Sequence, residues 1–344
     1  MLKSGSHKRK IEEIDNNNSK VDNNILSLQL DEAQKEFKSI WRQISHNDDD
    51  KYKFVSFVCE QLGINVEEPK IKMPLESKED SLLATIIQDI KDQLPDITSE
   101  SPDESICIPK NPSFDGYTKS NTLNIDGFLY NDDDVDELTE SGKIPSSYCL
   151  DCGSKSTQPY NFVSHSTTVD QLKFIFGDGV LGDLKDKVVL DIGSRLGSVL
   201  YTGYLYSSAK ELIGIEINSY FHNLQNEMIK KYKMQKRVTL VQGDIMKHVE
   251  LLKRSDVIYM NNVLEFFQEN LDLHIEFWKF IKEATQGRKG MRILTIPSIE
   301  ETFKNNKIPV KLKGWLKITP TDIPVPSDDP TYQDYNEIHL YTVI

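Results

Sequence analysis

Polar residues follow three apolar runs in the second half of the chain, at the points where strands are predicted to end. The first run leads into a loop with Asp191, Gly193 and Gly197, and glycine lets the backbone turn tightly and approach a ligand closely. The second run ends in Glu216, 25 residues beyond Asp191, and the third leads into Asp244. An acid after the second strand can accept both hydroxyls of a ribose, and an acid after the third can accept from an adenine amino group. This ordered set predicts a site for an adenosine-containing ligand.

A fourth apolar run ends in Asn261 and Asn262, which are candidates for the catalytic side of the site. A carboxamide can orient an amine nucleophile or hydrogen-bond the ligand, and transfer reactions gain much of their rate from proximity and orientation. The alternative is that both residues cap the helix that follows the strand. His165 is the third candidate, either as a general base with a pKa of about 6.5 or as a structural hydrogen-bonding residue.

Apolar runs and helical patterns alternate from Val169 onward, and this alternation defines the elements that position the candidate residues. It predicts a parallel sheet with helices on both faces, which is an α/β fold. The predicted strands are Lys187–Ile192, Leu212–Ile217, Val238–Gln242, Val257–Met260 and Arg292–Ile296, and the predicted helices are Val169–Phe176, Val199–Ser207, Tyr220–Lys233 and Leu271–Thr285. Two further strands, Trp315–Ile318 and Ile338–Ile344, have no helix predicted between them and suit an antiparallel pair that completes a mixed sheet. Open parallel sheets bind ligands outside the carboxyl ends of their strands, where the candidate residues lie.

The loop and the acids together resemble the class I S-adenosylmethionine-dependent methyltransferases, over about Val169–Ile344. Asp191, Gly193 and Gly197 match that family's D-x-G-x-G-x-G loop, which wraps the methionine end of the cofactor. The resemblance implies a Rossmann-like sheet of seven strands, S-adenosylmethionine as the cofactor, and methyl transfer as the reaction. It also implies that the following residues border the cofactor: Asp191, Gly193, Ser194, Arg195, Gly197, Glu216, Asp244 and Asn261.

Three finer similarities narrow the family. Residues Asp256–Glu265, Lys289–Met291 and Thr295–Ser298 look like the broad type-11 subgroup. The Asn261-Asn262 pair is similar to non-SET histone lysine methyltransferases. The signatures Y-C-x-x-C-G at 148–153 and S-R-L-G at 194–197 are similar to an uncharacterised eukaryotic methyltransferase-like group.

Arg195 stands where the family has its middle glycine. If that position requires a positive φ, a residue other than glycine costs on the order of 1–2 kcal/mol. Two interpretations follow. Arg195 pairs with Asp191 or with the cofactor carboxylate, which are contacts that arginine makes well; or the loop is degenerate and the chain is a non-catalytic relative. Because Asp191, both flanking glycines, Glu216 and Asp244 are all present, we expect cofactor binding.

Composition divides the chain into four parts. Residues 1–24 are polar and predict a disordered tail. Residues 25–95 carry helical periodicity around Phe37–Ile44, Phe54–Leu62 and Leu82–Leu94, and predict a small α-helical N-terminal region. Residues 96–147 contain prolines and an excess of acids, 11 acids against 2 bases from Asp96 to Glu137, and predict a linker. Residues 148–344 are the predicted methyltransferase domain.

The cysteines do not predict a metal site. Cys149 and Cys152 have the spacing of half a zinc knuckle, but a closed structural zinc site needs four ligands. The other two thiols, Cys59 and Cys107, are remote in sequence, so we interpret this segment as a turn with free thiols.

The 344-residue chain has a formal charge of −13 and no apolar run of about 18 residues, so no membrane span is predicted. The first 22 residues contain no apolar block, so no secretory signal is expected and the thiols should be reduced. No basic stripe indicates nucleic-acid binding. Lys8, Arg9 and Lys10 form a short basic cluster, either a nuclear address or part of a solvated tail. We therefore expect a cytoplasmic or nuclear protein.

The function predicted from the sequence is S-adenosylmethionine-dependent methyl transfer. The acceptor is open, with a protein amine favoured by the asparagine pair and by analogy. The alternatives are a small-molecule methyltransferase and a non-catalytic cofactor-binding relative.

Overall fold

The computed structural model describes residues 48–61, 77–95, 97, 101–102, 104, 106–108, 114–149, 157–164, 166–177, 179–267 and 270–344. The chain divides into two compact units, residues 1–75 and 76–344. In the first unit, helix α2 spans Asp48–Gln61, where the sequence predicts a helix over Phe54–Leu62. The predicted tail and the helix predicted around Phe37–Ile44 lie outside the described residues.

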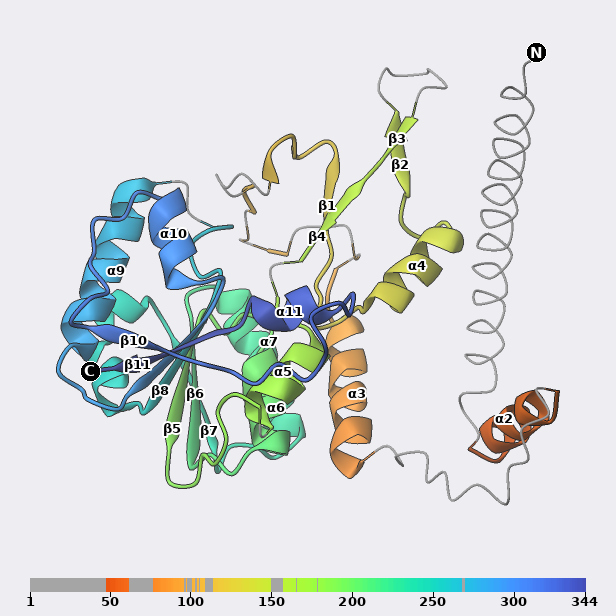
Figure 1. Cartoon of the computed structure of the whole chain (residues 1–344), viewed down its shortest axis with the longest axis horizontal. Helices are drawn as coiled ribbons and strands as arrows, with labels where there is room; N and C mark the ends of the chain where they lie inside the picture. The colour runs from red at the N-terminus through yellow and green to blue at the C-terminus, as the bar shows by residue number, and fades with distance from the viewer. Residues whose placement is uncertain are drawn as a thin grey trace, which may run out of the picture. The chain divides into compact units, whose positions relative to one another are not determined.

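The second unit is built on a mixed sheet of seven strands in the order β10-β11-β9-β8-β5-β6-β7 (Figure 1). The five strands from β9 to β7 run parallel, and β11 is antiparallel to both β9 and β10, as predicted. The strands are β5 (Val188–Ile192), β6 (Glu211–Glu216), β7 (Val238–Gln242), β8 (Val257–Asn261), β9 (Arg292–Ile296), β10 (Leu316–Thr319) and β11 (His339–Val343). The chain adds β6 and β7 on one side of β5 and then β8 and β9 on the other. The end of β5 is therefore the switch point at which open sheets bind ligands.

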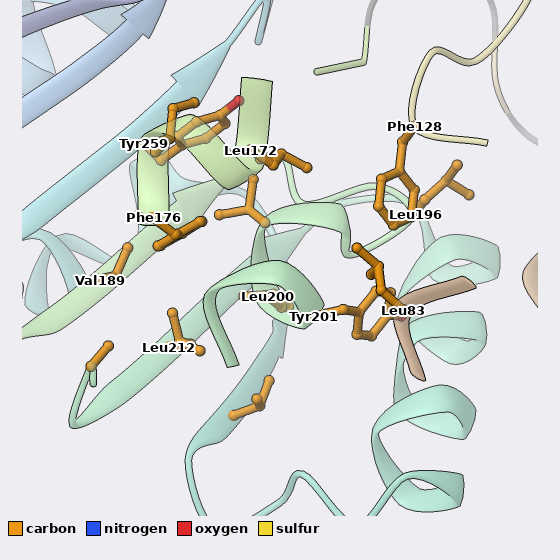
Figure 2. Close-up of a cluster of buried hydrophobic side chains, with 14 of the residues drawn as sticks. Leu83, Phe128, Leu172, Phe176, Val189, Leu196, Leu200, Tyr201, Leu212 and Tyr259 are labelled. Carbon is orange, nitrogen blue, oxygen red and sulfur yellow. The ribbon is translucent and has the colours of Figure 1, made fainter. Parts of the chain in front are cut away.

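Helices cover both faces of the sheet, and each face has its own apolar core (Figure 1). One core joins α5 (Val169–Phe176), α6 (Ser198–Tyr206) and α7 (Ser219–Lys231) to the sheet, and α3 (Lys78–Lys91) packs against α6 and α7. In this core Leu83 of α3 lies with Phe128, Leu196 and Tyr201 (Figure 2). The other core joins α8 (Val249–Arg254), α9 (Leu271–Thr285) and α10 (Ile299–Asn305). The third predicted N-terminal helix therefore packs with the sheet unit.

The segment from 96 to 147 contains described elements that contact the sheet unit. Strand β1 (Thr122–Asn124) pairs in parallel with β4 (Asn161–Val163), and β2 (Ser147–Cys149) pairs with β3 (Thr157–Pro159). Helix α4 (Asp132–Glu140) begins with a capping box formed by Asn131 and Asp134. Phe128 is only 1% exposed. This segment therefore contributes to the core and approaches the ends of the strands.

Local sequence signals account for most element boundaries. Helix α5 has the predicted bounds and begins with a capping box, in which the backbone N–H of Gln171 donates to Thr168 Oγ1; it ends before Gly177. Helix α9 and strand β9 have the predicted bounds. The prediction of no helix between β10 and β11 was wrong, because α11 spans Tyr332–Asn336 there. This helix has barely more than one turn and no buried residue, so it leaves no apolar period in the sequence.

Candidate active site

The loop after β5 is a tight turn that passes over the end of β6. Gly193 and Gly197 have φ angles of 79° and 84°, in the left-handed region that favours glycine. The backbone N–H groups of Gly193 and Ser194 both donate to Ile215 O, at 2.9 and 3.2 Å. A Cβ on Gly197 would lie 2.7 Å from the Tyr201 hydroxyl, so the loop has no room there for a side chain. These features hold the loop between β5 and β6, at the switch point.

Asp191, near the end of β5, is a buried acid, with 3% of the residue exposed. Burial and the neighbouring charge of Glu216 raise the pKa of Asp191 well above its usual range. No cation among the described residues offsets this shift. Helix α6 has Gly197 as its N-cap and no side-chain cap, so Asp191 does not cap that helix. The Asp191 carboxyl is therefore a candidate partner for a positively charged ligand, whose charge would favour the ionised form that burial disfavours.

Glu216 ends β6 and joins the loop to the start of α7. Its two carboxylate oxygens accept the backbone N–H groups of Arg195 at 2.8 Å and of Asn218 at 2.7 Å. Burial raises the pKa of Glu216, and these two hydrogen bonds partly offset the shift. Each oxygen retains a second lone pair, so the carboxylate can still accept from a ligand.

Asp244 follows β7 and caps a short 3-10 helix, accepting the Met246 backbone N–H at 2.9 Å. Together with Glu216, Gly193 and Val263 it lines a cavity of about 550 Å³. The cavity extends from the end of β5 across β6 to the loop after β7. The structure thus brings Gly193, Arg195, Glu216 and Asp244, four of the residues predicted to border the cofactor, into one cavity.

Arg195 adopts a φ of 39°, in the left-handed region. Its guanidinium donates to both oxygens of Glu104, at 2.6 and 3.0 Å, and to Asp126 Oδ2 at 2.5 Å. The guanidinium carbon also lies 4.7 Å from the centre of the Phe221 ring. The partners of Arg195 are therefore two acids of the preceding segment rather than Asp191. Both carboxylates accept charge-assisted hydrogen bonds from the guanidinium, and the contact with Glu104 is bidentate.

Asn261 and Asn262 lie at the end of β8 and are joined by hydrogen bonds. Asn262 Nδ2 donates to Asn261 Oδ1 at 2.9 Å, and Asn261 Nδ2 donates to Thr167 Oγ1 at 2.7 Å. Thr167 is also hydrogen-bonded to the buried hydroxyl of Tyr259. The next helix is α9, whose N-cap is Asn270, so neither asparagine caps a helix there. His165 lies outside the described residues.

A second, much smaller pocket adjoins the loop on the side of β8. It is lined by Asp191, Gly193, Thr167 and Asn261, among others, and its volume is only about 40 Å³. A pocket needs roughly 10–15 Å³ of such space to hold one water molecule, so this pocket admits only a few waters. Ser194 and Arg195 also line it. All the residues predicted to border the cofactor, apart from Glu216, Asp244 and Gly197, therefore meet at this pocket.

A third cavity, of about 490 Å³, lies over the ends of β8 and β9. Asn262 is in its wall, together with the carboxylates of Glu265, Glu301 and Glu337. No lysine or arginine lines it among the described residues. A cavity with this lining attracts cations. Asn262, in its wall, is hydrogen-bonded to Asn261, which lines the small pocket.

Residues 190–286 match a family model described as a methyltransferase domain. The match runs from β5 to just beyond α9 and so includes the loop, Glu216, Asp244 and both asparagines. The chain contains a type-11-like methyltransferase core. The matched domain supports a methyltransferase enzyme, and such a domain implies a methyl donor of the S-adenosylmethionine type.

Solved methyltransferase structures match the chain at low sequence identity. An O-methyltransferase from Bacillus cereus in complex with SAH is 10% identical, with 62% of this chain and 89% of that chain covered and a TM-score of 0.33. The C-terminal domain of precorrin-6Y C5,15-methyltransferase from Rhodobacter capsulatus is 15% identical, with 50% and 85% covered and a TM-score of 0.30. No curated protein matches the sequence.

Several residues that contact the site were not found by sequence reasoning. Glu104 and Asp126 lie in a segment with linker composition, and nothing local marks them as partners of Arg195. Thr167 lies just before the predicted helix Val169–Phe176, and Tyr259 lies within the predicted strand Val257–Met260, so neither stood out as a partner of the asparagine pair. A hydrogen bond between side chains of elements remote in sequence leaves no local signal in the sequence. The end of a strand does leave such a signal.

Within the described part of the chain, no group of histidine, cysteine and acidic side chains is arranged to hold a metal ion. Cys149 is exposed at the end of β2, and Cys152 lies outside the described residues. No described helix has the length and apolarity needed to cross a membrane.

Proposed function

We propose that this enzyme binds S-adenosylmethionine along the ends of β5, β6 and β7 and transfers its methyl group to an amine carried by a protein. The observation that carries the proposal is the cavity of about 550 Å³ that Gly193, Glu216 and Asp244 line together. Two further features fit this cofactor. Gly193 allows the backbone to approach a ligand, and Asp191 is a buried acid that no described cation neutralises.

Each part of the site has a distinct task in this proposal. Bound S-adenosylmethionine supplies a methyl group on a sulfonium sulfur, which keeps the electron pair of the broken C–S bond when a nucleophile attacks. Glu216 accepts hydrogen bonds from the ribose hydroxyls and Asp244 borders the adenine. Asp191 offsets the positive charge at the methionine end. Asn261 and Asn262 border the acceptor and restrict its orientation, which is how a transfer enzyme lowers its barrier most directly.

The cavity over β8 and β9 supports an amine as the acceptor. Its three carboxylates attract an ammonium group, and an amine must lose a proton before its lone pair can attack. A carboxylate in the wall can accept that proton.

Replacing Glu216 with glutamine is expected to weaken binding of S-adenosylmethionine by about 10- to 100-fold. A hydrogen bond to a charged group contributes about 1.5–3 kcal/mol, and the amide cannot accept with both of its ends. Isothermal titration calorimetry measures the affinity. Glu211→Gln, at the opposite end of β6, is the matched control and should leave it unchanged. Wild-type protein that gives no heat at millimolar cofactor would contradict the proposed function itself.

The acceptor class is tested with radiolabelled S-adenosylmethionine and fractionated lysate. We expect label in proteins, in a form that survives mild base and so distinguishes an N-methyl group from a methyl ester. Label confined to small molecules would instead favour the small-molecule alternative. Cofactor binding without any transfer, in every fraction, would favour the non-catalytic alternative.

A further inference from the structure

The segment before the methyltransferase core crosses the cofactor site and is bonded to both of its walls. On one side, Asn218 Nδ2 at the start of α7 donates to Pro102 O at 3.0 Å. On the other side, the Cys107 backbone N–H donates to Phe266 O, in the loop after β8, at 2.7 Å. Between these two points Glu104 lines the cavity of about 550 Å³. We name the described residues 101, 102, 104 and 106–108 the strap.

Arg195 fixes the strap to the loop after β5. Its guanidinium holds Glu104 in a bidentate contact, and the exposed fractions of the two side chains are 18% and 5%. An arginine with a φ of 39° pays a backbone cost on the order of 1–2 kcal/mol relative to glycine. A charge-assisted, bidentate contact of this kind offsets that cost.

Asp126 makes a second link, across the small pocket beside the loop. Its Oδ2 accepts from Arg195 Nη1 and from Ser166 Oγ, both at 2.5 Å. Arg195 and Ser166 both line that pocket, so Asp126 ties two of its walls together. The pocket held in this way has a volume of only about 40 Å³, too small for the amino-acid end of S-adenosylmethionine.

We infer that Arg195, Glu104 and Asp126 form a latch that keeps the cofactor site closed at its methionine end, and that the latch must open before S-adenosylmethionine can enter. This inference rests on the proposed function. Ion pairs suit such a latch because water solvates both charged groups again when the latch opens. The difference in free energy between the closed and the open state is therefore small. The latch explains why an arginine occupies the position of the family's glycine.

The decisive variant is Asp126→Asn. In the protein, Oδ1 accepts the Phe128 backbone N–H at 3.0 Å, while Oδ2 faces two donors. An amide that keeps the first contact must turn its NH₂ group toward both donors, so the hydrogen bonds of Asp126 with Arg195 and with Ser166 are both lost. Glu104 still neutralises Arg195, so no buried charge is left without a partner.

Surface plasmon resonance with S-adenosylmethionine and immobilised full-length protein separates the association and dissociation rates. If the closed state excludes the ligand, the observed association rate is that of the open state multiplied by the fraction of molecules that are open. The dissociation rate is unchanged. Asp126→Asn is therefore expected to raise the association rate by about 10- to 100-fold, which is the strength of charge-assisted hydrogen bonds. Glu211→Gln, which breaks a bidentate pair with Arg254 at the other end of the sheet, is the matched control.

An unchanged association rate in Asp126→Asn would overturn the latch. Faster dissociation with unchanged association would also overturn it, because that pattern shows Asp126 contacting the cofactor directly. If Asp126→Asn does not fold, Glu104→Gln tests the same prediction through the other ion pair.

Hydrogen exchange of the cofactor-free protein tests the latch without any ligand. Amides of residues 101, 104 and 106–108 of the strap and of residues 193–197 should exchange faster in Asp126→Asn than in wild type, and equal exchange would contradict the inference. If neither wild-type protein nor Asp126→Asn binds S-adenosylmethionine but the variant shows this faster exchange, the proposed function is wrong, while the contacts of Asp126 still hold the strap against the loop.

Discussion

Replacing Asp191 with asparagine is expected to lower kcat/KM by about 10- to 100-fold and, at the same time, to stabilise the free protein. The loss follows because a charge-assisted contact in a buried site contributes about 1.5–3 kcal/mol or more, and the amide carries no charge to offset the cofactor's. The gain follows because Asp191 is a buried acid that no described cation neutralises. Such substitutions at functional sites commonly add about 0.5–2 kcal/mol of stability, or a few degrees in Tm.

The same substitution should change the pH dependence of stability. Burial raises the pKa of Asp191 in the native state above the ordinary value of 3.8, which applies to the unfolded state. At pH values between the ordinary and the raised pKa, the native state therefore binds more protons than the unfolded state. The contribution of Asp191 to the free energy of unfolding is therefore fully present at pH values below its ordinary pKa. It falls as the pH rises from the ordinary pKa to the raised pKa. Asp191→Asn removes this fall.

Chemical denaturation of both proteins from acidic to neutral pH measures the effect. The advantage of Asp191→Asn over wild type should grow with pH, while Asp322→Asn, at an exposed position, should show no such trend. If Asp191→Asn is less stable than wild type at neutral pH, the buried carboxylate has a stabilising partner and our account of the site is wrong.

The sequence predicts the sheet well because buried parallel strands are short, nearly continuous apolar runs between helical patterns. The strands β5 to β9 were all found in this way. Helices α8, α10 and α11 were not, because six, seven and five residues are too few to display a helical period.

The site is predictable where it depends on strand ends and not where it depends on the preceding segment. Glu216 and Asp244 share a cavity with Gly193 because parallel strands place their carboxyl ends at one edge. The partners of Arg195 lie 91 and 69 residues before it. Prolines and acids in that segment indicate a linker, and only the tertiary structure shows that two of those acids meet a buried guanidinium.

Replacing Arg195 with glycine is expected to destabilise the protein by about 1–4 kcal/mol, although glycine suits the backbone better. Removing one partner of a buried ion pair costs about 3–5 kcal/mol, because the charges of Glu104 and Asp126 are left without compensation. Relief of the positive φ at residue 195 returns about 1–2 kcal/mol of this. Thermal and urea unfolding give the net difference.

The triple variant Arg195→Gly, Glu104→Gln, Asp126→Asn distinguishes lost charge balance from lost packing. It removes the latch without leaving a buried charge, so it should recover most of the stability, to within about 1 kcal/mol of wild type. Arg254→Ala is the control, since its bidentate pair with Glu211 is 43% and 24% exposed and should contribute no more than about 1 kcal/mol. If the triple variant is as unstable as Arg195→Gly, the guanidinium acts through its packing on Phe221. If the triple variant recovers stability and also binds the cofactor faster, Arg195 keeps the cofactor-free protein closed and thereby slows entry of the cofactor.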